Sequence, residues 1–62
     1  MKKLMFKAKL LRLEAEMEGW KARVAAYSAR GETGAEGFLE AASNIEAIGR
    51  GIENLINEYN GK

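Results

Sequence analysis

Residues 30–36 read Arg30-Gly31-Glu32-Thr33-Gly34-Ala35-Glu36, and this stretch divides a chain that is otherwise rich in helix-forming residues. Gly31 suits the left-handed residue that commonly ends a helix. Thr33 and Glu36 have the spacing of a capping box, in which a Thr hydroxyl and a Glu carboxylate satisfy backbone N–H groups where a helix begins. Because one helix ends and another begins within about three residues, the two helices are expected to run antiparallel.

On the N-terminal side of this turn, the sequence predicts a helix over residues 2–30. Its large apolar residues recur at alternating spacings of four and three, which places them on one narrow stripe of the helix, as in a coiled coil. This stripe comprises Phe6, Leu10, Leu13, Met17, Trp20, Val24 and Tyr27.

On the C-terminal side, the sequence predicts a turn at 31–33 and a second helix over residues 34–60. The apolar stripe of this helix is broader, and so it can contact more than one neighbouring helix. Its centre comprises Ala35, Phe38, Ala42, Ile45, Gly49, Ile52, Ile56 and Tyr59, and it is widened by Ala41, Ile48 and Leu55 on one side and by Leu39 on the other.

The two stripes can be matched residue by residue. If the turn centres near residues 32–33, the numbers of opposing residues add to about 65. Gly49 then falls opposite Trp20 and Met17, where a missing side chain leaves room for bulk. Capping, period and register agree, which predicts an all-α, coiled-coil-like antiparallel two-helix hairpin that forms one domain over 1–62. The clearest opposing pairs are Tyr27 with Phe38, Trp20 with Ile45, Leu13 with Ile52 and Phe6 with Tyr59.

A lone hairpin of 62 residues leaves its stripes open along one side. Small chains usually add disulfides, a metal or a partner subunit, and the absence of cysteine and histidine leaves the partner. We therefore expect a homodimer that completes a four-helix bundle, with a higher oligomer or another helical protein as further partners. The predicted self-association seam comprises Phe6, Leu10, Leu13, Met17, Trp20, Val24, Tyr27, Phe38, Ala42, Ile45, Ile48, Gly49, Ile52, Leu55, Ile56 and Tyr59.

The first helix carries another apolar stripe nearly opposite the seam. Surface alanine favours a helix by itself, but helix propensity does not explain Leu4 and Leu11. A second interface is therefore an alternative to a merely solvated alanine surface. It comprises Leu4, Ala8, Leu11, Ala15, Ala22, Ala25 and Ala29.

The net charge of +1 is unevenly distributed. Residues 1–31 hold eight basic and three acidic side chains, a balance of +5, whereas residues 32–62 hold two and six, a balance of −4. The basic N-terminal segment has three interpretations: a solvated flank that pairs with Glu53 and Glu58, a surface that binds nucleic-acid phosphates, or an anionic-membrane contact. Its basic residues are Lys2, Lys3, Lys7, Lys9 and Arg12.

Several functional classes are not expected. The longest apolar run has four residues, Val24 to Tyr27, whereas a transmembrane helix needs ~20. Lys7, Lys9 and Arg12 interrupt what would be the core of a signal peptide, so a cytoplasmic location is expected. The sequence indicates no convergent set of catalytic residues, so we expect no enzyme, no metal and no cofactor.

The pattern therefore favours a non-enzymatic, self-associating hairpin that acts as a structural or adaptor module for protein–protein interaction. The alternatives are a small nucleic-acid-binding regulator that uses the basic N-terminal helix, and a peripheral membrane-associated helical protein. These functions share one fold and differ in the surface that each would use.

Overall fold

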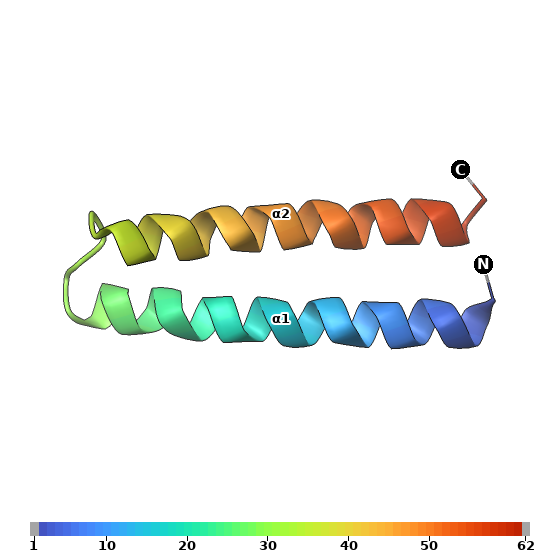
Figure 1. Cartoon of the computed structure of the whole chain (residues 1–62), viewed down its shortest axis with the longest axis horizontal. Coiled ribbons are helices and arrows are strands. Elements are labelled where there is room, and N and C mark those ends of the chain that lie inside the picture. Colours follow the sequence, from blue (N-terminus) through green and yellow to red (C-terminus); the bar gives the residue numbers. More distant parts are fainter. Residues whose placement is uncertain (1, 62) are drawn as a thin grey trace.

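The computed structural model describes residues 2–61 and contains two α-helices, α1 (Lys3–Ala29) and α2 (Glu36–Tyr59), joined by one turn (Figure 1). The helices pack against each other and run antiparallel, so the start of α1 and the end of α2 both lie opposite the turn (Figure 1). The prediction of an all-helical, two-helix architecture is confirmed for these residues. Met1 and Lys62, which the predicted domain 1–62 includes, lie outside the described residues.

Gly31 ends α1 as the sequence predicts. Its φ of +70° is left-handed, and its N–H donates to the carbonyl of Ser28 at 3.0 Å. The N–H of Glu32 reaches further back, to the carbonyl of Tyr27 at 2.9 Å. These two bonds form a Schellman motif, which satisfies carbonyl groups that have no partner inside the helix.

The predicted capping box at the start of α2 is wrong. Ala35, not Thr33, is the N-cap residue, and no side chain caps the helix. The N–H of Ala35 donates to the carbonyl of Glu32 at 3.2 Å, so Thr33 lies inside a turn and two residues too early to cap. As a result α2 begins at Glu36, two residues later than predicted, and α1 is one residue shorter at each end.

Contacts at two heights along the hairpin agree with the predicted register. Near the chain ends, the rings of Phe6 and Tyr59 stack with their centroids 4.2 Å apart and their planes at 19°. Near mid-height, the methyl carbon of Met17 lies 3.9 Å from the position that a Cβ on Gly49 would take. Each of these contacts joins a residue of α1 to a residue of α2, so the seam of α1 faces the apolar side of α2.

Gly37 takes part in a third contact between the helices, one that the pattern of apolar residues does not predict. The phenol ring of Tyr27 lies directly over this glycine, and an added Cβ would be only 2.6 Å from the Tyr27 Cζ atom. Gly37 therefore lets an aromatic ring of α1 approach the backbone of α2 closely.

This contact lies on the side of the broad α2 stripe that packs against α1. Gly37 and Ala41 are four residues apart and share a helix face. Ala41 is fully buried, whereas its neighbour Ala42 is exposed. The structure thus corrects the predicted centre of the stripe: in the hairpin, α1 packs on the line of Ala41, Ile48 and Leu55, and the line of Ala42, Gly49 and Ile56 lies to one side.

Candidate interaction surfaces

The predicted seam is mostly half-buried in the single hairpin. Within residues 2–61, only Ala41 and Leu55 are buried. A core of two small or medium side chains is slight for a folded chain, because burial of apolar surface is the main favourable contribution to folding. The half-buried seam residues are Phe6, Leu10, Leu13, Met17, Trp20, Val24, Tyr27, Phe38, Ile45, Ile48, Gly49 and Ile52, while Ala42, Ile56 and Tyr59 are exposed.

The surface area of the hairpin also indicates that a single copy buries too little of its surface. The chain exposes 4659 Å² at a mass of 6.8 kDa. A compact monomer of this mass exposes about 4,000 Å², so the hairpin carries roughly 700 Å² more than expected. The excess reflects its flat, elongated shape, which measures 43 × 18 × 12 Å.

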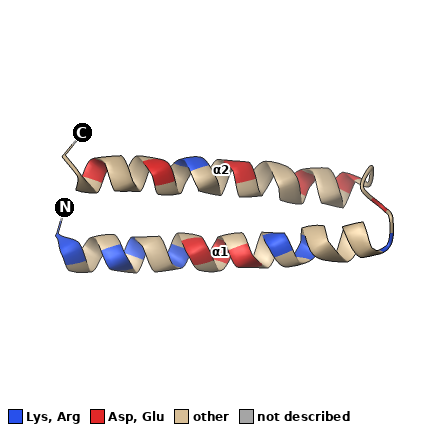
Figure 2. Ribbon diagram, turned by 180° about the vertical axis from the view of Figure 1, so that it is seen from behind, with Lys and Arg blue, Asp and Glu red and all other residues tan. Residues whose placement is uncertain are grey.

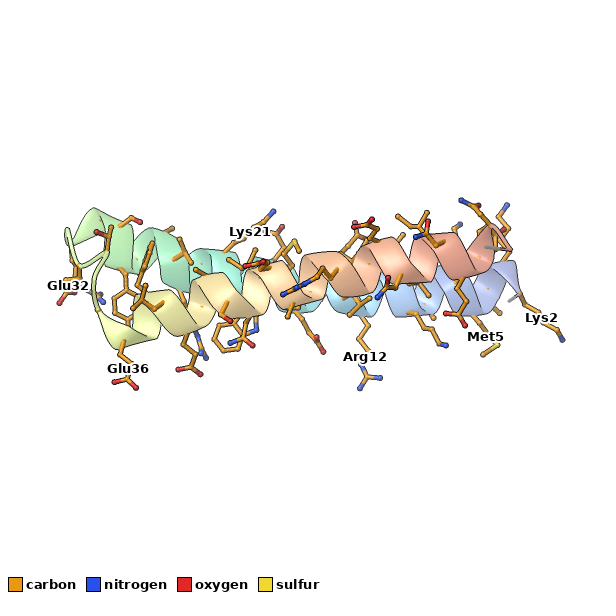
Figure 3. The ribbon with its side chains drawn as sticks, turned by 90° about the horizontal axis from the view of Figure 1, so that it is seen from above. Lys2, Met5, Arg12, Lys21, Glu32 and Glu36 are labelled. Carbon is orange, nitrogen blue, oxygen red and sulfur yellow. The ribbon has the colours of Figure 1, made fainter. Side chains whose placement is uncertain are left out.

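The two broad faces of the hairpin differ. One, the closed face, carries the Tyr27 ring over Gly37 and lies on the side of buried Ala41 and Leu55. Figure 3 shows the side chains of Lys21 and Arg12 pointing to opposite faces. The other, the open face, lies on the Lys21 side. It comprises Ala42, Gly49 and Ile56 from α2 with Lys7, Glu14 and Lys21 from α1, and on α2 it is bordered by the line of Leu39, Glu46 and Glu53.

Exposed aliphatic side chains mark the open face as incomplete. Leu39 is 58% exposed and Ile56 is 40% exposed, although both belong to the apolar stripe of α2. The exposed Ala42 lies between them along the helix. The flanking charges of α1 leave this strip of apolar surface open to a partner.

Trp20 lies toward the closed face. The Arg23 guanidinium carbon is 4.5 Å from the Trp20 ring centroid, a cation–π arrangement worth about 0.5–1 kcal/mol at exposed sites. Glu16 and Gly19 line a shallow depression together with these two residues. All four lining residues belong to α1, two of them are charged, and the depression is open to solvent, which suits the edge of a protein contact better than a small-molecule site.

The outer face of α1 is exposed along its length. Leu4 is 80% exposed and Leu11 is 67% exposed, the two residues that helix propensity does not explain. The alanines of the predicted second interface, Ala8, Ala15, Ala22, Ala25 and Ala29, are exposed as well. The structure places this set on one surface of α1, away from α2.

The basic N-terminal residues are exposed, and among residues 2–61 none of them forms an ion pair. The interpretation of a solvated flank therefore keeps its exposure but has no ion pair to Glu53 or Glu58 in this part of the chain, and an exposed ion pair would contribute little stability. Figure 2 shows the blue colour of Lys and Arg concentrated along the first half of the α1 ribbon. The basic N-terminal residues are Lys2, Lys3, Lys7, Lys9 and Arg12.

All ion pairs within residues 2–61 are local in sequence. Lys21 pairs with Glu18 at 3.7 Å and Arg50 with Glu46 at 3.6 Å, each within one helix turn. The third pair, Arg30 with Glu32, spans the end of α1. No charge pair between the two helices holds this part of the hairpin together, so apolar packing does.

The turn carries its own small cluster. Glu32 accepts a hydrogen bond from the Arg30 side chain, and this bond raises the pKa of the Arg30 guanidinium above its ordinary value. The same guanidinium lies 4.9 Å from the centroid of the Tyr27 ring. The cluster therefore links the end of α1 to the ring that covers Gly37.

Within the described residues 2–61, no three acidic side chains gather where they could hold a metal ion. Neither helix is both long and apolar enough to cross a bilayer. In comparisons with known proteins, this chain matched no protein-family model, no curated protein and no solved structure.

Proposed function

We propose that this chain is a small non-enzymatic module that associates with a second copy of itself, forms a four-helix bundle, and acts as a structural or adaptor protein. The observation that carries the proposal is the nearly absent core: within residues 2–61, only Ala41 and Leu55 are buried. A regular stripe of apolar side chains contributes little to stability while it is half-exposed, and a second copy related by twofold symmetry would bury it.

The size of the unburied surface supports a dimer. A standard protein–protein interface buries about 800 Å² per partner. The hairpin exposes 4659 Å². Burying about 800 Å² of this surface in a dimer would leave each copy with nearly the exposed area of a compact monomer of its mass. One partner of the same shape is therefore enough to remove the excess.

Solution mass and helicity, measured together over dilution, test self-association. We expect twice the mass of the chain at high micromolar concentration, and a coupled loss of mass and helical circular dichroism on dilution. The Tm should rise with protein concentration, since association adds stability by mass action. A fully helical monomer whose Tm is independent of concentration would contradict the proposal.

The adaptor role uses the outer face of α1. Its exposed Leu4 and Leu11, with the alanines between and beyond them, would contact another helical protein or another dimer. In the double variant Ala15→Glu/Ala22→Glu, we expect the dimer mass to persist and any larger assembly to disappear. Larger assemblies that survive both substitutions would show that this face is only solvated alanine.

A second candidate function is nucleic-acid binding. It is favoured by one observation: five exposed basic side chains lie close together without ion pairs among residues 2–61. Replacing Lys2, Lys3, Lys7 and Lys9 by Gln should then abolish an electrophoretic mobility shift with RNA or duplex DNA. It should also flatten the salt dependence of binding, because fewer counterions are released. Absence of a shift at low salt would exclude this function.

A third candidate is attachment to an anionic membrane surface. Leu4 and Leu11 are largely exposed beside the same lysines, which is the composition of an interfacial helix. Flotation with vesicles tests it. Binding to anionic but not to neutral vesicles would support this function, and protein left at the bottom of the gradient with both would exclude it.

A further inference from the structure

We propose that the two copies dock through their open faces with both turns at the same end, so that α1 of each copy lies against α2 of the other. This inference rests on the proposed self-association and adds to it the surface used and the orientation of the partner. The burial and the shape of the open face favour this docking surface, and the charges of the two helices favour this orientation.

The open face is the docking surface because it is the apolar side that the hairpin leaves uncovered. Ile56 remains 40% exposed there and Leu39, at its border, 58% exposed, whereas Ala41 and Leu55 are buried. The hairpin is 43 Å long and 18 Å wide, and a face of these dimensions is close to the ~800 Å² per partner of a standard interface. Ala42 on this face is exposed and has a short side chain, so a partner helix can approach α2 closely at this point.

Twofold symmetry permits two ways to stack the same face of two hairpins. An axis along the hairpin places both turns at one end and sets α1 against the partner's α2. An axis across the hairpin places the turns at opposite ends and sets α1 against the partner's α1. The apolar surface buried is similar in both, so charge distinguishes them.

The helices carry opposite net charges. α1 holds six basic and three acidic side chains, a balance of +3, and α2 holds one and five, a balance of −4. Figure 2 shows red acidic segments spaced along α2 with a blue basic segment among them, and the sequence identifies the basic residue of this helix as Arg50. With the turns at the same end, every neighbouring pair of helices has opposite charge. With the turns at opposite ends, each new contact joins helices of like charge, which is unfavourable.

Individual charged residues of α1 have different neighbours in the two arrangements. The midpoint of α1 is Glu16, so a twofold axis across it would bring Glu14 level with Glu18 of the partner subunit, twice per dimer. With the turns at the same end, Lys21 lies within one turn of Glu46 of the partner subunit and Glu14 lies at the same offset from Glu53 of the partner subunit. These two pairs offset each other, so the net charges of the helices make the choice. Lys21 and Glu46 are more than half exposed, so both can re-pair on docking.

A distance between two labels at the turn tests the orientation. The chain has no cysteine, and Thr33 is exposed and caps no helix, so Thr33→Cys places one spin label per copy without disturbing a contact. Helices in a bundle lie about 8–10 Å apart, so with the turns at the same end we expect turn labels roughly 15–25 Å apart, label arms included. With the turns at opposite ends they would be separated by about the length of α1, ~40 Å.

Asn60→Cys at the other end of the hairpin is the matched control. In the proposed dimer it also gives a short distance, whereas a mixture of the Thr33→Cys and Asn60→Cys chains adds a long one. A long turn-to-turn distance in a sample with dimer mass overturns the orientation and leaves the proposed function intact. A monomer mass with no coupling between labels overturns both.

Discussion

Gly37 is the clearest case of a single residue that sets the packing of the hairpin. The Tyr27 ring occupies the space that a side chain would need, and the nearest ring atoms are too close for a Cβ. Gly51, on the same helix, has nothing within 4 Å of its Cβ position. Two glycines in one helix therefore have opposite expected responses to alanine.

We expect Gly37→Ala to destabilise the fold by about 1–3 kcal/mol, because the ring must move or the helices must separate. Gly51→Ala should stabilise it by about 1 kcal/mol, the difference in helix propensity. Urea midpoints from circular dichroism, at one protein concentration for all variants, measure both. A neutral Gly37→Ala would mean that the Tyr27 ring leaves Gly37 at no cost.

At the scale of an element, the turn depends on Gly31 and not on Thr33. The φ of +70° at Gly31 belongs to the Schellman motif that ends α1, whereas Thr33 makes no cap to α2. The helix start is satisfied by backbone alone, with Ala35 accepting from the N–H of Leu39 at 3.1 Å.

Gly31→Ala should cost about 1–2 kcal/mol, since alanine must take the left-handed conformation. For a chain of this size each kcal/mol lowers the Tm by about 4–8 °C. Thr33→Ala should leave the Tm nearly unchanged. Thermal melts compare the Tm of the two variants. If Thr33→Ala lowered the Tm as much as Gly31→Ala does, Thr33 would cap α2 in solution, contrary to the structure.

For the molecule as a whole, two exposed alanines of α2 distinguish the face that a second copy covers from the face that stays in solvent. Ala42 lies on the open face, and Ala47 lies on the outer surface of α2; both are exposed alanines of one helix. Arginine at either position changes the net charge and the helix propensity equally. A difference between the two variants therefore reports only on the face.

We expect Ala42→Arg to weaken the dimer by at least about tenfold, because a long charged side chain would enter the interface beside Lys21. Ala47→Arg should leave the dissociation constant unchanged. Sedimentation over a dilution series measures both constants. Equal constants for the two variants would place the interface elsewhere.

How much of this molecule follows from its sequence depends on the residue considered. Gly31 and the regular spacing from Phe6 to Tyr27 determine two antiparallel helices and their register, because a left-handed stop and a helical period are local properties of a chain. The side of α2 that meets α1 is not local. The spacing of apolar residues puts Ala42 in the centre of the α2 stripe and Ala41 at its side, whereas in the hairpin Ala41 is buried, Ala42 is exposed, and the Tyr27 ring lies over Gly37 on the side of Ala41. Tertiary packing made that choice, because it depends on the shapes of side chains that are ten residues apart and meet only once the chain has folded back.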